Sequence, residues 1–439
     1  MNARETLKSD ERGHLIVGGA DACELAKEFG TPLYVFDEKH IRDMCGIYRD
    51  TLKREYGEGM ALYASKAFSC KAIYKIAQSE GLGADVVSGG ELYTALSSGF
   101  PADRIYMHGN NKLYSELEAA VSNKIKSIVV DSLDEFEIID ELAKKYDTVQ
   151  YVLIRVNPGV EAHTHHYIQT AKVDSKFGFS IANGDAMSAA KKALQFGNVK
   201  LGGFHCHIGS QIFEKKPFAI AVDKMTDFIA EFKAQTGCEA EELNMGGGFG
   251  IWYTDEDRKI GVPEYAEYIK TITDALKKAC EEKKLKRPFL TLEPGRSLIG
   301  ESGITLYTVG AVKEIAGLKK YVAVDGGMFD NPRYALYQAK YTPVAAADVQ
   351  SDALETVTLA GKCCESGDMI AADVRLPRVK RGDIVAVLST GAYNYSMASN
   401  YNRNKVPSAV LVKDGKARVI IKKQTDDDLV RNDVVPSDL

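Results

Sequence analysis

Short apolar runs alternate with longer amphipathic stretches between about residue 55 and about residue 295. The runs are almost uniformly hydrophobic, which is typical of strands that are buried on both faces of a parallel sheet. The stretches between them repeat apolar residues every three or four positions, and this spacing indicates amphipathic helices. We therefore predict strands over the ranges 61–66, 82–88, 104–109, 127–132, 151–157, 201–210, 242–250 and 289–297.

Eight strand–helix units over about 250 residues are the number expected for an α/β fold of the TIM (β/α)8 barrel type. A doubly wound sheet would instead place its glycine-rich turn after the first strand. In this chain the glycine run GGGFG follows the seventh predicted strand. We therefore predict a TIM barrel domain over residues 38–302.

The pattern changes after about residue 303, where alternating and β-branched runs are separated by glycine, aspartate and lysine–glycine turns. Such runs are typical of an antiparallel sheet or barrel. The opening segment, HLIVGGADACELAKEFGTPLYVFD, has a strand-like run at each end and no place among the eight units. We therefore predict an antiparallel β domain that is built from both chain ends, residues 1–37 and 303–439.

The composition excludes several classes of function. Of the 439 residues 45% are hydrophobic and 27% are charged, and a net charge of −5 gives no basic footprint for nucleic acid. No apolar run approaches the roughly 20 residues of a membrane helix, and the polar N-terminus does not resemble a signal peptide. The eight cysteines form no CxxC pair and are typical of reduced thiols. We expect a cytoplasmic protein with neither a nucleic-acid partner nor a membrane partner.

Polar residues collect at the carboxyl ends of the predicted strands, which is where the active site of a TIM barrel lies. They include an amine, two acids, three imidazoles and a glycine run. The set is Lys66, Asp85, Ser88, His108, Arg155, Asn157, His205, His207, Ser210, Gly246–Gly248, Glu293 and Arg296.

Three chemistries use parts of this set. The pair His205 and His207 shares one face of a strand and could bind zinc in a metal-dependent hydrolase, but zinc leaves Lys66 unexplained. A Schiff-base aldolase explains the lysine but not GGGFG beside EPGR. Pyridoxal phosphate needs a lysine, a phosphate cradle and a charge partner for its pyridine nitrogen. Lys66, the glycines with Ser210, and Glu293 supply these three, and His207 can stack on the ring.

The chain resembles the diaminopimelate decarboxylases in nine motifs that occur in the family's order: YASKA, GADVVSGGEL, RVNPGVEAHTHHYIQT, SKFG, HCHIGSQI, NMGGGFG, EPGRS, GKCCESGD and GAYNYSMASNYN. This family belongs to the fold-type III pyridoxal phosphate enzymes, together with alanine racemase and ornithine decarboxylase. Each motif alone is weak, but nine in register over essentially the whole chain are specific. The resemblance implies a pyridoxal phosphate-binding TIM barrel, a β domain from both chain ends, and a homodimer with shared active sites.

The resemblance also implies roles for individual residues. Lys66 is the Schiff-base lysine, and Cys364 returns a proton to the substrate from the other subunit. Asp85 supports the lysine, although a helix N-terminus is its alternative partner. The implied cofactor contacts are Lys66, Asp85, His207, Ser210, Gly248, Glu293, Pro294, Gly295, Arg296 and Tyr393. The implied substrate contacts are Arg296, Arg333, Tyr337, Glu365 and Tyr393.

The substrate can also be argued from the residue types. Diaminopimelate is an amino acid at both ends, so its distal end needs a guanidinium for the carboxylate and an acid for the ammonium. Arg296 and Arg333 beside Glu365 supply that pairing. We therefore predict decarboxylation of meso-2,6-diaminopimelate to L-lysine and CO₂, the last step of lysine biosynthesis. The alternatives are a related decarboxylase acting on ornithine or arginine, and a regulatory homologue without catalysis, which typically lacks the lysine or the cysteine.

The chain departs from the family's pattern at two places. Tyr334 follows Arg333 where the family often has proline, and the arginine-rich continuation after SNYN is thinned to RNKVP, so that Arg403 and Lys405 must carry more of its contacts. A further feature is a tract that looks metal-binding but lies in a segment the family uses between barrel units. We interpret it as loop or substrate-lid residues and expect no metal site; its members are His163, His165 and His166.

Overall fold

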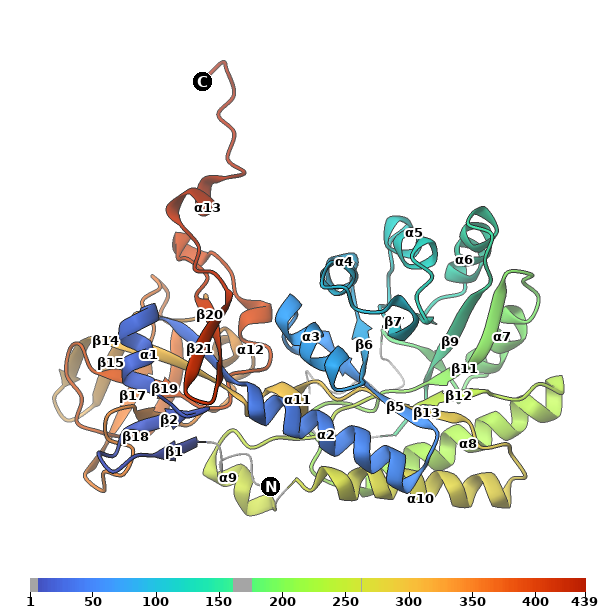
Figure 1. The fold of residues 1–439 in the computed structure, drawn as a ribbon, viewed down its shortest axis with the longest axis horizontal. Coiled ribbons are helices and arrows are strands. Elements are labelled where there is room, and N and C mark those ends of the chain that lie inside the picture. The colour runs from blue at the N-terminus through green and yellow to red at the C-terminus, as the bar shows by residue number, and fades with distance from the viewer. Residues whose placement is uncertain (1–6, 161–175, 262) are drawn as a thin grey trace. The chain divides into compact units, whose positions relative to one another are not determined.

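The structure is a computed structural model that describes residues 7–160, 176–261 and 263–439 (Figure 1). The chain forms two compact units. The barrel unit contains residues 42–250 and 263–298, and the β unit contains residues 1–41, 251–262 and 299–439. The predicted domain boundaries near residues 38 and 303 stay a prediction, because dense internal contact does not by itself make a unit an independent domain.

Parallel strands close a barrel in the barrel unit. Each strand pairs with the next one along the chain, and the last pairs with the first. The short β10 (Phe179–Ser180) pairs in parallel with the end of β9. This closure confirms the predicted TIM barrel. Its strands are β5 (Gly59–Ala64), β6 (Gly83–Val86), β7 (Ile105–Met107), β8 (Ser127–Val130), β9 (Gln150–Asn157), β11 (Val199–His205), β12 (Glu242–Asn244) and β13 (Phe289–Leu292).

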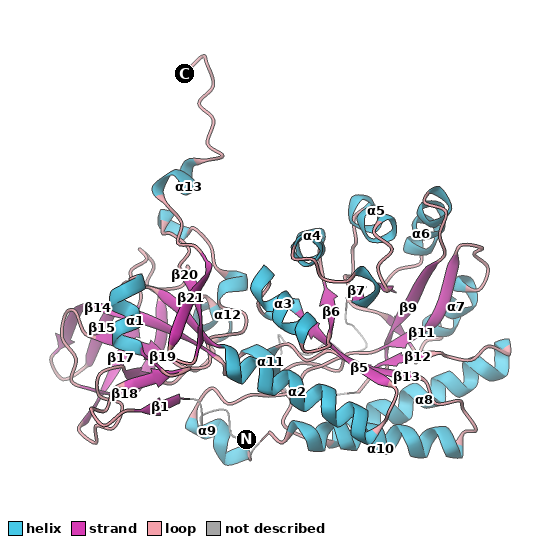
Figure 2. Cartoon of the chain, viewed as in Figure 1, coloured by secondary structure: helices cyan, strands magenta, loops and turns pink. Residues whose placement is uncertain are grey.

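Helices cover the outside of the barrel, as Figure 2 shows. Each buries one apolar face; in α10, for example, Ile269, Ile272 and Leu276 are buried at helical spacing. No helix in the described part of the chain is both long and apolar enough to cross a membrane. The helices of this region are α2 (Glu38–Glu55), α3 (Lys71–Ser79), α4 (Gly89–Ser97), α5 (Tyr114–Ser122), α6 (Asp134–Lys145), α7 (Asp185–Ala193), α8 (Lys216–Thr236), α10 (Tyr265–Glu282) and α11 (Arg296–Ile299).

The β unit is built around a second sheet with the strand order β18-β17-β15-β14-β4-β20-β21, and β19 pairs with β14 and β16. The early strand β4 lies between two strands from the far end of the chain, which confirms that both chain ends build this unit. The strands are β4 (Leu33–Asp37), β14 (Gly303–Ile315), β15 (Lys319–Val324), β16 (Pro343–Ala345), β17 (Leu354–Ala360), β18 (Met369–Pro377), β19 (Ile384–Val387), β20 (Ser408–Lys413) and β21 (Lys416–Ile421).

The second sheet is mixed, so the prediction of an antiparallel domain is wrong in this respect. β4 runs antiparallel to β14 but parallel to β20, and β15 runs parallel to β17. The neighbours of β4 run in opposite directions, so β4 can be antiparallel to only one of them. The β15–β17 pair is possible because the connection between these strands is long and carries the short helix α12 (Arg333–Tyr337).

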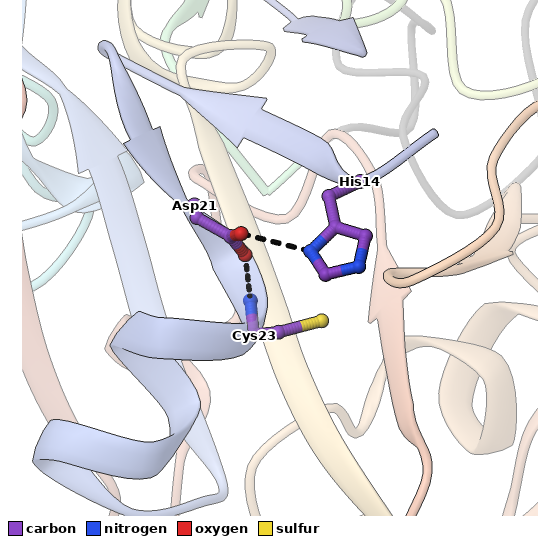
Figure 3. Close-up of side chains that lie close together, drawn as sticks. All are labelled: His14, Asp21 and Cys23. Atoms are coloured by element: carbon purple, nitrogen blue, oxygen red, sulfur yellow. Dashed lines mark hydrogen bonds and ion pairs between the residues drawn. The ribbon is translucent and has the colours of Figure 1, made fainter. Parts of the chain in front are cut away.

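A small sheet leads into the first helix of the β unit. It contains β1 (Leu7–Ser9), β2 (Leu15–Val17) and β3 (Ala20–Asp21), and α1 (Ala22–Phe29) follows. Asp21 is the N-cap of α1: its side chain accepts from the Cys23 N–H at 2.8 Å and lies 2.8 Å from His14 Nδ1 (Figure 3). Arg12 also binds this carboxylate, at 2.7 Å.

Cys23 completes a set of three possible metal ligands with His14 and Asp21. The Asp21 oxygens, however, are already engaged by Arg12, by His14 and by the start of α1. Burial also raises the pKa of the Cys23 thiol to about 11, which disfavours the thiolate that a metal requires. Helix capping therefore explains this cluster without a metal.

Asp330 makes the stability of the β unit depend on pH. Its carboxylate is fully buried and accepts from Tyr307 Oη and from the Gly327 N–H, and burial raises its pKa to about 7. An unfolded aspartate titrates near pH 4, so the folded chain binds more protons between about pH 4 and pH 7. The free energy of unfolding therefore falls as the pH rises through this window.

We expect Asp330→Asn to remove this dependence. Relative to the wild type, the variant's free energy of unfolding should improve by about 1–3 kcal/mol between pH 5 and pH 8. Denaturant unfolding of both proteins at the two pH values measures this change. Asp352→Asn, at an exposed position, serves as the control. A parallel pH dependence in the wild type and in Asp330→Asn would contradict the prediction.

Candidate active site

The predicted Schiff-base lysine follows directly from strand β5. Ala61 to Ala64 are buried, and the strand ends in a 3-10 turn, Ser65–Ala67, in which Lys66 is exposed. Ser65 fixes this turn, because its buried Oγ lies 2.8 Å from the Asp85 carbonyl oxygen and 2.9 Å from Glu91 Oε2. The apolar strand thus anchors the backbone, while the Lys66 amine avoids the cost of burial.

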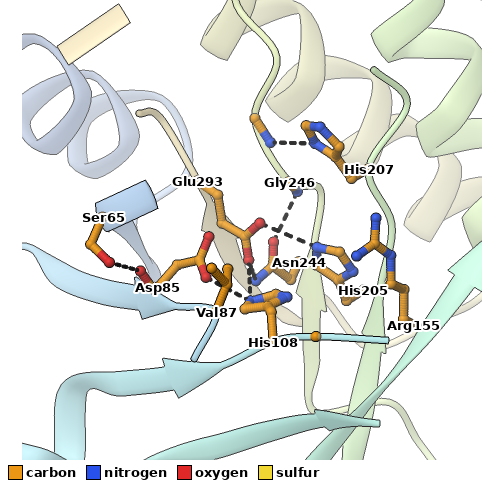
Figure 4. Close-up of polar contacts among 12 residues, drawn as sticks. Ser65, Asp85, Val87, His108, Arg155, His205, His207, Asn244, Gly246 and Glu293 are labelled. Carbon is orange, nitrogen blue, oxygen red and sulfur yellow. Dashed lines mark hydrogen bonds and ion pairs between the residues drawn. The ribbon is translucent and has the colours of Figure 1, made fainter. Parts of the chain in front are cut away.

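Glu293 lies at the centre of a buried polar cluster formed by strand ends (Figure 4). It follows β13 and is only 7% exposed. Its Oε1 lies 2.8 Å from His108 Nε2 and accepts from Asn244 Nδ2 at 2.7 Å, and its Oε2 lies 3.2 Å from His205 Nε2. His108 follows β7, and His205 and Asn244 end β11 and β12. Four separate strands therefore converge on one carboxylate.

The two imidazoles decide the charge of this carboxylate. Burial alone would raise the pKa of Glu293, but His108 and then His205 outweigh it and hold this pKa well below its usual value. Burial lowers the pKa of His205 to about 4, so this ring is neutral near pH 7. Burial opposes charge on His108 as well, but Asp85 and Glu293 together raise the pKa of that imidazole. Glu293 is therefore an anion at neutral pH.

The carboxylate of Asp85 lies near the same cluster. Its Oδ1 lies 3.6 Å from His108 Nε2, and burial raises its pKa to about 7. The N-cap of α4 is Ser88, whose side chain accepts from the Glu91 N–H, so Asp85 does not cap that helix. Lys66 lowers the pKa of Asp85 through its charge, after the larger effect of His108, which places the lysine within electrostatic reach of this acid.

The glycine run after β12 allows three backbone segments to meet. A Cβ atom at Gly247 would lie 2.0 Å from the Glu293 carbonyl oxygen, and one at Gly248 would lie 2.2 Å from the Gly209 carbonyl oxygen. Gly248 also has a φ of +103°, which favours glycine. Beside this run, Arg296 Nη2 donates to Ser210 Oγ at 3.0 Å. A guanidinium, a hydroxyl and backbone N–H groups of a glycine loop are donors that suit a phosphate.

The structure separates the two histidines of the HxH motif. His205 contacts Glu293, whereas His207 Nδ1 accepts from the Gly247 N–H at 3.3 Å (Figure 4). The zinc alternative, which needs His205 and His207 together, is therefore not supported by these contacts. His108, His205 and Glu293 do lie close enough to share an ion. Their contacts with one another already explain why they lie together, so a metal is not needed to account for them.

The donor set fits pyridoxal phosphate at each of its chemical ends. A carboxylate offers about four lone-pair sites, and three groups contact Glu293, so it can accept one further N–H from a pyridine nitrogen. Lys66 offers an accessible amine for an aldehyde. Ser210 and Arg296, beside the glycine run, offer donors for a phosphate.

The predicted proton donor lies in the loop between β17 and β18 of the β unit. Cys364 is exposed, and its N–H donates to Asn402 Oδ1 at 2.8 Å. Its neighbour Cys363 is buried, its N–H donates to Asp368 Oδ2 at 2.6 Å, and burial raises the pKa of its thiol to about 11. Glu365, the predicted ammonium partner, is exposed on the same loop.

The remaining predicted substrate residues lie on other elements of the β unit. Arg333 begins α12, is buried, donates to Tyr341 Oη and lies 4.9 Å from the centre of the Tyr253 ring. Tyr337 ends the same helix and is half-buried. Tyr393 has a φ of +66°, a conformation that is rare for a residue with a bulky side chain.

The two departures from the family's pattern have structural explanations. Tyr334 is the second residue of α12, in a first helical turn that tolerates proline but does not require it. Arg403 and Lys405 pair with Asp433 at 3.0 Å and with Asp426 at 2.8 Å, so both cations bind the C-terminal segment. The histidine tract His163, His165 and His166 lies outside the described residues.

Glu293 was predicted as a site residue from the sequence, but none of the residues that contact it was predicted to do so. His108, His205 and Asn244 were visible as polar residues at or near strand ends, and Asn244 stands two positions before the glycine run. A polar residue at the end of each neighbouring strand was the available signal, and it indicates a shared cluster only once the barrel is known.

The chain matches known proteins over nearly its whole length. Residues 44–300 match the family described as pyridoxal-dependent decarboxylase, pyridoxal binding domain. Diaminopimelate decarboxylase of Bacillus subtilis (strain 168) is 47% identical over 429 residues, which cover 98% of this chain and 97% of that protein. The enzyme of the same name from Staphylococcus aureus (strain COL) is 48% identical over 429 residues, covering 98% and 99%.

Solved structures give the same result. The crystal structure of diaminopimelate decarboxylase from M. jannaschii in complex with L-lysine has a TM-score of 0.91 at 37% identity, and the match covers 100% of both chains. A lysine/ornithine decarboxylase from Vibrio vulnificus, at 23% identity and a TM-score of 0.74, shares the fold. The chain therefore belongs to the pyridoxal-dependent decarboxylases and, among them, to the diaminopimelate decarboxylase family.

Proposed function

We propose that this enzyme is a pyridoxal phosphate-dependent carboxy-lyase that converts meso-2,6-diaminopimelate to L-lysine and CO₂, the last step of lysine biosynthesis. The observation that carries the proposal is the set of groups at the carboxyl ends of the barrel strands. An exposed amine on Lys66, a buried anion on Glu293 and a hydroxyl–guanidinium pair beside the glycine run occur on one barrel. The family to which the chain belongs supports the same reaction.

The cofactor-binding residues follow from these groups. Lys66 binds the cofactor covalently, and Asp85 supports the lysine. Glu293 pairs with the ring nitrogen and His207 contacts the ring. The phosphate is held by Ser210, Gly248, the turn Pro294–Gly295–Arg296 and Tyr393. When it is bound, pyridoxal phosphate withdraws electrons from the substrate α-carbon, and this allows the α-carboxylate to leave as CO₂.

Glu293 is suited to pair with the pyridine nitrogen because it is a charged carboxylate that is buried away from bulk water. A negative charge beside a pyridine nitrogen favours the protonated ring, which is the stronger electron acceptor. The partners of Glu293 are a neutral amide and two imidazoles, and these keep the buried charge in place. A buried carboxylate that lacked them would gain a proton and lose this effect.

Cys364 returns the proton to the α-carbon after CO₂ has left. The chain forms a homodimer with shared active sites, and the partner subunit's Cys364 completes each site. The exposure of Cys364 supports this role, since a proton donor that serves another subunit must reach beyond its own chain. We also propose a cytoplasmic location, because all eight cysteines are free thiols, as is usual in a reducing compartment.

Substrate selection rests on the distal end of diaminopimelate. Arg296 and Arg333 bind its carboxylate, Glu365 binds its ammonium, and Tyr337 and Tyr393 line the same end. Ornithine and arginine carry a distal cation without a carboxylate, so they would leave a guanidinium unpaired. The regulatory-homologue alternative is disfavoured, because the chain keeps both the lysine and the cysteine that such proteins typically lose.

The test is the release of CO₂ and lysine by the purified protein with pyridoxal phosphate, offered meso-diaminopimelate, ornithine and arginine in parallel. We expect kcat/KM for diaminopimelate to exceed the other two by about 10⁴-fold, because a site built for polar groups rejects a substrate without them. Faster release from ornithine or arginine would reject the substrate assignment but keep the cofactor site. No release from any substrate, with cofactor bound, would favour the regulatory homologue.

A further inference from the structure

Two buried imidazoles contact Glu293, the acid that is proposed to pair with the nitrogen of the cofactor ring. Neither imidazole has a role in the proposed reaction. His108 and His205 are 4% and 1% exposed. Their Nε2 atoms lie 2.8 Å and 3.2 Å from opposite oxygens of Glu293, and the rings contact each other edge to face with centres 4.8 Å apart. Both rings therefore point at one carboxylate from two different strands (Figure 4).

The third partner of the carboxylate fixes its orientation. Asn244 donates to Glu293 Oε1 through Nδ2 at 2.7 Å, while its Oδ1 accepts from the Gly246 N–H at 2.9 Å. The backbone contact decides which end of the amide faces the acid. With a neutral donor on one side and imidazoles on both oxygens, the carboxylate plane cannot rotate without losing a contact.

The surroundings of the cluster favour different charge states on the two imidazoles. His108 is close to two acids, since its Nε2 lies 2.8 Å from Glu293 Oε1 and 3.6 Å from Asp85 Oδ1. His205 lies beside His108 and near Arg155, whose guanidinium is paired with Asp131 at 3.9 Å. Two acids favour a cation on His108, whereas burial, with smaller contributions from His108 and Arg155, lowers the pKa of His205 and keeps it neutral. A neutral ring can still donate from Nε2.

We propose that His108 and His205 are positioning residues for the cofactor: together they hold Glu293 as an oriented anion, and they act on the ring nitrogen only through that carboxylate. This inference rests on the proposed function, because it assumes that Glu293 meets the pyridine nitrogen. It assigns to each imidazole a contribution that disappears if the cofactor has no ring nitrogen.

The test compares two ligands, pyridoxal phosphate and 1-deazapyridoxal phosphate, in which a C–H group replaces the ring nitrogen. Affinities for both are measured by equilibrium dialysis with wild type, His108→Leu and His205→Leu. We expect each variant to lose about 10- to 100-fold in affinity for pyridoxal phosphate, the range for a hydrogen bond to a charged group. The affinity for the deaza compound should change less than about threefold, since it gains nothing from an oriented anion.

Two further variants keep the test decisive. Ser210→Ala, on the phosphate side, is the matched control and should weaken both ligands equally. His108→Gln retains an N–H donor without the charge and should recover part of the preference for pyridoxal phosphate, which a loss of folding would not allow. Equal losses of both ligands in the histidine variants would overturn the inference. Failure of the wild type to bind either ligand would instead reject the proposed function.

Discussion

Lys66→Ala is expected to lower kcat for diaminopimelate by about 10⁴- to 10⁶-fold, the range seen when other enzymes lose a covalent catalytic group. Lys66 is the exposed amine at the end of a buried strand, and its neighbours Ser65 and Ala67 are buried. The substitution removes the amine without disturbing the turn, because the turn is fixed by the Ser65 side chain. Single-turnover and steady-state kinetics on the purified variant measure the loss.

The variant Lys66→Arg separates the amine from its charge. It keeps a cation near Asp85 and His207, whose pKa values the Lys66 charge lowers. It cannot form a covalent bond with an aldehyde under ordinary conditions. Both variants should therefore lose the stable link between cofactor and protein that borohydride reduction produces in the wild type. A cofactor link that survives in Lys66→Ala would show that another amine carries it and would remove the central residue of the proposal.

Cys364→Ala is expected to lower kcat by about 10²- to 10⁴-fold, the usual contribution of a positioned proton donor. A thiol S–H carries a transferable proton, and Cys364 is exposed, so its side chain can serve as a proton donor. Lysine made in deuterium oxide by the wild type should carry one deuterium at its ε-carbon, the former α-carbon of the reacting end, in one configuration. In the variant, protonation from solvent should reduce that stereochemical purity, and NMR of a chiral derivative of the lysine measures it.

The adjacent cysteine provides the matched control. Cys363 is buried and holds the loop through Asp368, so Cys363→Ala should cost about 1 kcal/mol of stability and leave kcat within about threefold. A large loss of kcat in Cys363→Ala with normal activity in Cys364→Ala would reverse the assignment. Normal activity in both variants would remove the thiol from the reaction.

The barrel could be predicted because its strands are buried on both faces and are therefore uniformly apolar. The residues at which the strands end could not be predicted in this way. The predicted strand 242–250 ends at Asn244, since Gly246 and Gly248 have φ values of +65° and +103° and leave the extended conformation. The polar residues that follow a strand contribute side chains to the candidate site instead of pairing with a neighbouring strand. Hydrophobicity alone does not show where strand pairing stops.

Whether two strands pair in parallel or antiparallel fashion could not be predicted from the sequence, for a related reason. Alternating side chains look the same in parallel and antiparallel strands, so the runs of the β unit carried no sign that β4 runs parallel to β20. The site shows the same limit. Glu293 was recognisable as an acid after a strand, but its contacts with His205 and Asn244 join residues 88 and 49 positions apart and leave no local pattern.

The position of β4 also has a consequence for how the chain is made. Leu33–Asp37 leaves the ribosome early, but its antiparallel partner begins only at Gly303 and its parallel partner at Ser408. At about 5–20 residues per second, an apolar strand waits for roughly a quarter of a minute to a minute for its first neighbour. The barrel can close within that delay, because all of its strands lie in between. A nascent chain that stalls before residue 303 therefore contains the complete barrel sequence and, before it, an apolar strand without its sheet partners. We expect such a chain to bind chaperones through that strand.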